Sequence, residues 1–299
     1  AEIGEGRVMK VLRRVILPVI TVTVAALLML SVYVLWDNRR VVNTEYIFKS
    51  ERVPMVFDGF KIALITDFHN SADYERVLDA VRDSSPDIIC IAGDLVSMKT
   101  TDYSNTKRLI NQLTRIADVY YAYGNHEYFN ATYRNSEKPP IKEILKGSDV
   151  IFLNNEVKSI EKDGEKIYLA GYADSVHGDG DGAFWEHAEP VLKGMNKHMN
   201  TEILSVLLLH RAQYFDEVSQ LPFDLVLGGH LHGGQVNIEP FKTMILEKHV
   251  KTAKYSRGEY FENGHELIIS GGCGNDGIPR VFNTPEVVTV TLKHEAKDE

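Results

Sequence analysis

The sequence predicts an α/β domain, in which helices cover a β-sheet, preceded by one transmembrane helix. Two observations lead to this prediction. From about residue 59 onward, short apolar segments typical of buried strands alternate with amphipathic segments typical of helices. Near the N-terminus, residues 15–36 (VILPVITVTVAALLMLSVYVLW) contain no charged residue, and this length is enough to cross a hydrocarbon layer of about 30 Å.

The apolar segment is interpreted as an uncleaved membrane anchor. A buried helix would show a polar stripe, and a cleaved signal peptide would be shorter and followed by small residues rather than by WDNRR. Tyr33 and Trp36 stand where an aromatic belt meets the membrane surface. The segment is flanked by charged residues, Arg7, Lys10, Arg13 and Arg14 before it, and Asp37, Arg39 and Arg40 after it. The basic excess on the N-terminal side predicts a single-pass protein of the cell membrane with its large domain extracytoplasmic.

The remaining elements are expected in the following order. Residues 1–14 form a short basic segment, 15–36 the anchor, 37–58 a tether, and 59–299 one folded domain. Within that domain we expect strands at 61–69, 87–94, 119–125, 150–155, 165–174, 202–210, 223–229, 265–272 and 286–292, and helices at 74–84, 104–116, 184–195 and 211–220. Residues 238–262 show no clear period and are expected to be mixed loop and short helix.

The composition excludes some classes of function. The chain has 299 residues and a net charge of −9, without a lysine- or arginine-rich run, so a nucleic acid is not an expected partner. About 250 residues outside the anchor are enough for one large domain with a full core. Two cysteines, Cys90 and Cys273, do not indicate a disulfide framework.

The segment GGHLHGGQ, residues 228–235, places His230 and His232 one residue apart between pairs of glycines. It follows FDLVL, which is short and apolar enough for a buried strand, so both histidines lie where a strand ends, the usual place for ligands in open α/β sheets. Side chains at i and i+2 of an extended segment share a face, and glycines permit sharp turns and close approach. The segment indicates a metal site, but two imidazoles are too few ligands and other segments must supply the rest.

Other predicted strands also end in residues of metal-ligand type. A single such cluster is usually a loop, a turn or a histidine satisfied within the core, but a succession of them at strand ends predicts one site at an edge of the sheet. The clusters are Asp67-Phe68-His69, Gly93-Asp94, Gly124-Asn125-His126-Glu127, His210, and Gly229-His230-Leu231-His232.

These motifs resemble those of the calcineurin-like metallophosphoesterases, whose pattern is DxH, GD, GNH(D/E), a strand-end histidine and GHxH. Here they read DFH, GD, GNHE, LLLH and GHLH, in that order, from about Lys61 onward. The C-terminal stretch SGGCGNDGIPRVFNTPEVVTVTL, with GGQ after GHLH, resembles the membrane-associated bacterial subgroup. One departure is that Arg211 and Ala212 follow His210 where many relatives have a proline two residues after the histidine, which puts the local loop shape in doubt.

The resemblance implies a four-layer α/β/β/α sandwich with two divalent metal ions at the sheet edge. It assigns one ion to Asp67, His69 and His232, and the other to Asn125, His210 and His230, with Asp94 bridging the two. Oxygen and imidazole ligands without thiolate suit Mn, Fe, Zn or Co and do not choose among them.

The resemblance also implies a mechanism. Two metal ions would lower the pKa of a shared water, held between them as hydroxide, which attacks phosphorus opposite the leaving oxygen. His126 has no metal role in the motif and would stabilise or protonate the leaving group. Arg280 is a candidate contact for a substrate phosphate, with a surface arginine as the alternative.

The expected function is a membrane-anchored phosphoesterase acting on phosphodiester or pyrophosphate bonds of lipid-linked or envelope substrates. A non-catalytic membrane sensor that kept the fold is the alternative, but such a site would be expected to lack a ligand. A metallohydrolase of amides or esters is the other rival. It would more often show HxH at the first strand or HExxH on a helix, and neither occurs here.

Overall fold

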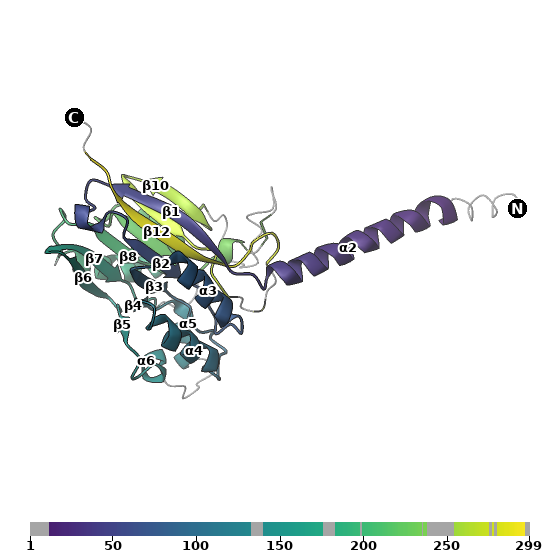
Figure 1. Ribbon diagram of the computed structural model, residues 1–299, viewed down its shortest axis with the longest axis horizontal. Helices are drawn as coiled ribbons and strands as arrows, with labels where there is room; N and C mark the ends of the chain where they lie inside the picture. Colours follow the sequence, from purple (N-terminus) through teal and green to yellow (C-terminus); the bar gives the residue numbers. More distant parts are fainter. Residues whose placement is uncertain are drawn as a thin grey trace, which may run out of the picture.

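Two six-stranded β-sheets form the centre of the protein. The computed structural model describes residues 12–132, 140–175, 183–197, 199–234, 236–237, 254–274, 277 and 280–296. Figure 1 shows the sheets packed face to face, helices on the outside, and one long N-terminal helix that extends away from the domain. The arrangement agrees with the α/β class that the alternating sequence pattern predicts.

The first sheet has the spatial order β1–β12–β2–β3–β4–β5, and all its strand pairs are parallel except β12 with β2. Its strands are β1 (Val42–Ser50), β12 (Glu286–His294), β2 (Lys61–Ile65), β3 (Ile88–Ala92), β4 (Asp118–Ala122) and β5 (Val150–Phe152). Because β2, β3 and β4 are parallel neighbours, their carboxyl ends lie side by side at one edge.

The second sheet has the order β10–β11–β9–β8–β7–β6, with antiparallel pairs only at its two margins. Its strands are β10 (Gly258–Glu262), β11 (His265–Ile269), β9 (Leu225–Gly228), β8 (Ser205–Leu208), β7 (Glu165–Gly171) and β6 (Glu156–Lys162). The central strands β8 and β9 are buried on both faces and are therefore almost entirely aliphatic.

Three hydrophobic cores separate four layers. The alternation of side chains along β2 puts Ile62 and Leu64 in the core between the sheets, and Ala63 and Ile65 in a core beneath the outer helices. The helices on that side are α3 (Tyr74–Ser84), α4 (Ser104–Leu113) and α6 (Ile141–Ile144), whereas α7 (Ala183–Asn196) and α8 (Phe215–Val218) pack on the second sheet. The shorter elements are α5 (Asn125–Thr132) and the helical turns η1 (Leu12–Ile16), η2 (Met55–Phe57), η4 (Ala212–Tyr214) and η5 (His232–Gly234). The α/β/β/α sandwich is thus present.

The N-terminal helix α2 (Leu17–Asp37) follows η1 directly. The continuous helix Arg13–Asp37 is long and apolar enough to cross a membrane, and none of its most apolar window is buried in the domain. Exposed side chains such as Val22, Met29 and Leu35 cover its surface. In water these would form an apolar patch far larger than a monomeric protein ordinarily exposes.

The expected tether at 37–58 is wrong over residues 42–50. Val42–Ser50 forms the edge strand β1, paired in parallel with β12 along nine residues. The expectation for residues 238–262 is wrong at its end, where Gly258–Glu262 forms β10, and residues 238–253 lie outside the described part of the chain. The predicted helix at 211–220 is instead two short turns, η4 and α8.

Glu266→Gln is expected to stabilise the protein in alkaline solution and to have little effect near pH 4. Burial, and then the nearby Glu259, raise the pKa of Glu266 to about 8. The Glu266 carboxyl group ionises near pH 4.5 in the unfolded chain but only near pH 8 in the folded chain. The free energy of unfolding therefore falls as the pH rises from 4.5 to 8, and it stays lower above pH 8. Thermal melts at pH 4, 6 and 9 would show a gain for the variant that grows with pH. An equal shift at all three values would contradict this origin.

Candidate metal centre

The predicted ligand residues meet at the edge where the strands of both sheets end. Asp67 and His69 follow β2, Asp94 follows β3, and Asn125 follows β4 in the first sheet. His210 follows β8, and His230 and His232 follow β9, in the second sheet. Stacking of the sheets brings the two sets together, with all but His232 buried.

One group contains Asp67, His69 and His232. The Nε2 atoms of the two histidines are 3.2 Å apart. Asp67 Oδ1 is 4.0 Å from Nε2 of His69 and 3.7 Å from Nε2 of His232. Two imidazole nitrogens and a carboxylate oxygen thus face a common point. Such a triangle of donors can hold one divalent cation.

A second group contains Asp94, His210 and His230. Asp94 Oδ2 is 3.1 Å from His210 Nε2, and it is also 4.0 Å from His69 Nε2 in the first group. Asp94 therefore lies between the two groups. Burial raises the pKa of Asp94, but the neighbouring His126 and His210 outweigh it and hold this pKa well below 3.8, so the group is a carboxylate.

Unpaired buried donors and acceptors indicate that this edge fits metal ions. Asp67 Oδ1 and Asn125 Oδ1 are buried and have no hydrogen-bond partner among the described residues. His210 Nδ1 donates to the carbonyl of Ala92 at 2.9 Å, so in the neutral ring the lone pair is on Nε2, which faces Asp94 and the site. An unpaired buried polar atom costs about 1–3 kcal/mol, a cost that coordination of a cation would remove.

Two of the imidazoles, those of His69 and His232, are kept neutral, the form that binds a cation. Burial, with His126 next, lowers the pKa of His69 to about 3. Burial and then Arg280 hold the pKa of His232 well below 6.5. His210 differs, because the charge of Asp94 outweighs its burial and raises its pKa to about 10. A cation at this position would therefore compete with a proton on His210.

The backbone at these residues is strained. Five of the predicted ligands have left-handed φ angles, namely Asp67 (51°), His69 (50°), Asp94 (54°), His230 (80°) and His232 (51°). Residues other than glycine rarely adopt this conformation, and each instance costs on the order of 1 kcal/mol or more. Strain of this kind is typical of functional sites.

Two glycines are required by close packing against the ligands. A Cβ atom on Gly229 would overlap the Asp67 carboxylate and Thr66, and one on Gly93 would overlap the His210 ring. Gly93 also has a φ of +86°. The motifs therefore require glycine at positions 93 and 229, because a side chain there would displace His210 or Asp67.

Glu127, the last residue of GNHE, has a role that the sequence did not reveal. Its buried carboxylate accepts hydrogen bonds from the backbone N–H groups of four residues, at 2.6–3.3 Å, namely Asp94, Leu95, Val96 and Gly124. It therefore ties the loop after β3 to the loop after β4. The spacing of the two motifs gives no sign of this contact, which only the folded chain produces.

Glu127→Gln is expected to destabilise the protein by about 2–4 kcal/mol and to weaken metal binding. An amide replaces one accepting oxygen with a donor, which would face backbone N–H groups for which the described residues provide no other acceptor. Chemical denaturation would measure the first effect and metal titration the second. The exposed Glu143→Gln serves as a control and should change neither, whereas a variant as stable as the wild type would contradict the role of Glu127.

The departure at residue 211 is explained by a buried ion pair. Arg211 Nε donates to Asp174 Oδ2 at 2.6 Å, and both side chains are almost fully buried. The guanidinium also lies over the ring of Phe184. The ion pair joins Asp174, in the segment after β7, to Arg211, the residue next to His210. It therefore fixes the loop that follows His210.

His126 lies at the rim of the site. Its side chain is 13 % exposed, its Nε2 is 3.9 Å from Asp94 Oδ2, and its ring packs edge-on against that of His69. Its Nδ1 can only accept from the backbone N–H of Met98, at 3.4 Å, which favours the proton on Nε2. The nitrogen that faces the site is therefore a donor.

Arg280 is buried beside His232. It is 1 % exposed, and its guanidinium donates to the carbonyls of Gly271 and Gly274, with Nη2 3.1 Å from His232 Nδ1. The alternative of a surface arginine is wrong, and the contact of Arg280 with a substrate phosphate stays a prediction. Because a guanidinium only donates, Nδ1 of His232 accepts, and a cation at Nε2 would replace the proton there.

The end of α2 lies beside this edge. β1 and β12 both begin next to α2, and β2 runs antiparallel to β12, so β2 ends on the same side. Asn38, which follows α2, donates to the Arg280 carbonyl at 2.6 Å and accepts from its N–H at 2.7 Å. Thr284 donates to Asp37 at 2.8 Å. The helix end is therefore joined through Arg280 to His232.

Comparison with known proteins identifies the family. The family model described as calcineurin-like phosphoesterase matches residues 60–234, more than half of the chain. The chain belongs to the calcineurin-like phosphoesterase family, and it is a phosphoester hydrolase of the metallophosphoesterase class.

Individual relatives agree with this class. An uncharacterized metallophosphoesterase, YkuE, of Bacillus subtilis (strain 168) is 27 % identical over 263 residues, which cover 84 % of this chain and 85 % of that protein. A transmembrane protein with a metallophosphoesterase domain from Danio rerio is 26 % identical over 259 residues, which cover 81 % of this chain and 55 % of that protein. Among solved structures, a phosphopantetheinyl hydrolase from Mycobacterium tuberculosis aligns with a TM-score of 0.47 and 10 % identity, covering 72 % of this chain and 91 % of that one.

Proposed function

We propose that the protein is a membrane-anchored phosphoesterase with two divalent metal ions, acting on phosphodiester or pyrophosphate bonds of lipid-linked or envelope substrates. The observation that supports this most is the position of Asp94. Its Oδ2 lies 3.1 Å from His210 Nε2 and 4.0 Å from His69 Nε2, between two groups of buried donors. A carboxylate in that position can serve two cations at once.

The donor set suggests how the ions are shared. We assign one ion to Asp67, His69 and His232, the other to Asn125, His210 and His230, and Asp94 to both. When bound, the ions would supply Lewis-acid charge for the phosphoryl oxygens and an acidified water. The donors are carboxylate, amide and imidazole, which suit Mn, Fe, Zn or Co.

His126 is proposed to act on the leaving group. It is the histidine at the rim that the metal assignment does not use, and its Nε2–H faces the site beside Asp94. A substrate phosphate above Asp94 would bring its leaving oxygen within reach of this N–H. Donation of the proton would neutralise the charge that develops as the P–O bond breaks.

Arg280 is proposed to position His232, and its contact with a substrate phosphate stays a prediction. It is held from one side by Asn38 and lies against His232 on the other. The same contacts fix the metal-binding edge to the end of the membrane helix, without a tether between them. A site in this position would meet phosphates of the membrane surface more often than soluble ones.

The large domain is proposed to be extracytoplasmic, with α2 crossing the membrane once. The exposed apolar surface of α2 supports the membrane location, and the basic residues before it support the orientation. A reporter fused after residue 299 tests the orientation. Activity of a reporter that works only in the cytoplasm would contradict it.

Asn38→Ala is expected to weaken metal binding about 10-fold, because groups that orient a ligand typically contribute that much. The change removes both hydrogen bonds to Arg280 and leaves the ligands themselves unchanged. Metal titration of the full chain in detergent measures the effect, and the exposed Gln220→Ala is the control. If the variant binds metal as the wild type does, Asn38 and Arg280 do not position His232.

The proposed activity is tested with the full chain in detergent, stripped of metal and reloaded with Mn²⁺. Bis-p-nitrophenyl phosphate and p-nitrophenyl phosphate distinguish diesterase from monoesterase activity. Mn²⁺-dependent cleavage of the diester supports the proposal. Metal binding without cleavage of either compound, or of a lipid-linked diester or pyrophosphate, would favour the non-catalytic sensor.

A further inference from the structure

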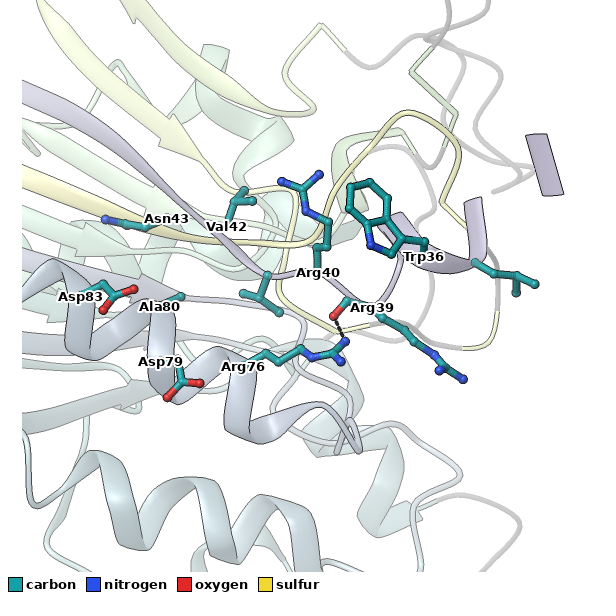
Figure 2. A pocket seen from close by; sticks show the side chains of 11 residues that line it. Trp36, Arg39, Arg40, Val42, Asn43, Arg76, Asp79, Ala80 and Asp83 are labelled. Atoms are coloured by element: carbon teal, nitrogen blue, oxygen red, sulfur yellow. Dashed lines mark hydrogen bonds between the residues drawn. The ribbon is translucent and has the colours of Figure 1, made fainter. Parts of the chain in front are cut away.

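A cavity of about 760 Å³ lies beside the end of α2, and its lining includes none of the residues of the metal-binding edge. Residues from the last turn of α2, the connection to β1 and the exposed face of α3 line it. Figure 2 shows these side chains around the junction of the helix and the domain. If α2 crosses a membrane, as proposed above, this cavity lies at the level of the lipid head groups.

The chemistry of the lining changes in order with distance from α2. Leu35 and Trp36 come from the helix itself, and Arg39, Arg40 and Arg76 come next. Asp79 and Asp83 follow one and two turns further along α3, about 4.5 and 10.5 Å beyond Arg76. In Figure 2, Trp36, Arg39 and Arg40 lie at the junction with α2, and Arg76, Asp79 and Asp83 follow one another along α3.

The arginines remain available to a ligand. Arg40 lies over the Trp36 ring at 4.7 Å and 3.5 Å from Asp37, and it is 44 % exposed. Arg76 is 3.3 Å from Asp73 and 48 % exposed, and its Nη1 donates to the backbone carbonyl of Arg39, which leaves the other N–H groups of its guanidinium for a ligand. The structure records no ionic partner for the Arg39 guanidinium among the described residues. The Arg76–Asp73 pair is exposed on both sides and contributes little, so a phosphate can replace Asp73. Asp37 is only 1 % exposed, and a phosphate would join it at the exposed guanidinium of Arg40.

The carboxylates offer a second subsite. Asp79 pairs with Arg82 at 3.2 Å, but both side chains are at least half exposed. The structure records no ionic partner for Asp83 within the described ranges. Two carboxylates beyond three guanidinium groups would repel a second negative charge and attract a cation.

We propose that the cavity binds the head group of a zwitterionic phospholipid with a primary ammonium, that is, a phosphoethanolamine lipid. The acyl chains would lie along Leu35 and Trp36, the phosphate against the arginines, and the ammonium against Asp79 and Asp83. A primary ammonium donates hydrogen bonds to carboxylates, which a trimethylammonium cannot do. The lipid is a ligand and not the substrate. Its role is to hold the end of α2, and with it the adjoining metal-binding edge, at a fixed distance from the membrane surface.

The test is native mass spectrometry of the full chain in detergent. The probes are phosphatidylethanolamine, phosphatidylcholine and phosphatidylglycerol with identical acyl chains. The wild type should bind phosphatidylethanolamine about tenfold more tightly than either of the others, the effect of one charge-assisted hydrogen bond. The double variant Asp79→Asn, Asp83→Asn should bind phosphatidylethanolamine and phosphatidylcholine equally, and Arg39→Gln with Arg76→Gln should weaken binding of all three.

Exposed residues at the far end of the first sheet provide matched controls, Arg115→Gln and Asp118→Asn, which should behave as the wild type. Equal binding of the three lipids, a preference for phosphatidylglycerol, or an undiminished preference in the double aspartate variant would overturn the proposal. Failure of the membrane placement gives a different result. In that case alkaline carbonate would release the chain from membranes, whereas a chain that stays in the membrane without head-group preference contradicts only the lipid site.

Discussion

Asp94→Asn is expected to lower kcat/KM for phosphoester hydrolysis by about 10³-fold or more, without unfolding the protein. Asp94 Oδ2 lies close to nitrogens of His69, His126 and His210, and its charge is the one that both proposed metal positions share. An amide removes that charge. The amide oxygen can still accept from the backbone N–H of His126, as Asp94 Oδ1 does now at 2.9 Å, so the fold should persist.

Steady-state kinetics together with metal analysis measure the effect. The variant should retain at most one tightly bound metal ion, and its thermal melt should resemble that of the wild type. Asp149→Asn, an exposed carboxylate outside the site, is the control and should keep full activity. If Asp94→Asn lost no more than about half of the activity, the shared carboxylate would have no place in the mechanism.

His126→Ala is expected to lower kcat by about 10²–10⁴-fold while the metal content stays nearly unchanged. The imidazole faces the site but lies outside the proposed ligand set, so its removal takes away a proton donor and leaves the metal positions intact. A good leaving group needs less protonation than a poor one. The loss should therefore be much larger for an alkyl phosphodiester than for a p-nitrophenyl ester.

This dependence on the leaving group separates two roles for His126. A merely structural histidine would lower both rates by the same factor. Loss of metal in the variant, or an equal loss for both substrates, would contradict the assignment of His126 as the donor to the leaving group.

The site could be predicted from the strand-end motifs because each motif directly follows its own strand in the sequence. Asp67, His69, Asp94, Asn125 and His210 each follow a short apolar strand, and parallel neighbours must end together. GHLH adds two more donors by the same rule. The structure brings these residues to one edge, and their individual roles in metal binding stay predictions.

Other features could not be predicted because they depend on partners far away in the chain. β1 (VNTEYIFKS) lacks a clear alternation and forms only because β12, some 240 residues later, supplies its partner. The hydrogen bonds of Asn38 to Arg280 span 242 residues. The burial of Arg280 and its hydrogen bonds to the carbonyls of Gly271 and Gly274 could not be predicted either, because the preference of guanidinium for phosphate says nothing about loop contacts.

Glu127 shows the same limit over a shorter distance. It stands in a motif that was singled out, yet its contacts to the loop after β3 arise from the parallel pairing of β3 and β4. Local pattern thus located the chemistry, and long-range pairing determined what holds it in place.

The most direct test of the two-metal centre is Mn²⁺ titration of the metal-free full chain, followed by electron paramagnetic resonance. The account predicts saturation at two ions per chain and the spectrum of an exchange-coupled pair. It also predicts that the coupling disappears in Asp94→Asn. A single ion at saturation, or two ions whose spectra are those of isolated Mn²⁺, would contradict a centre in which Asp94 joins the two metal positions.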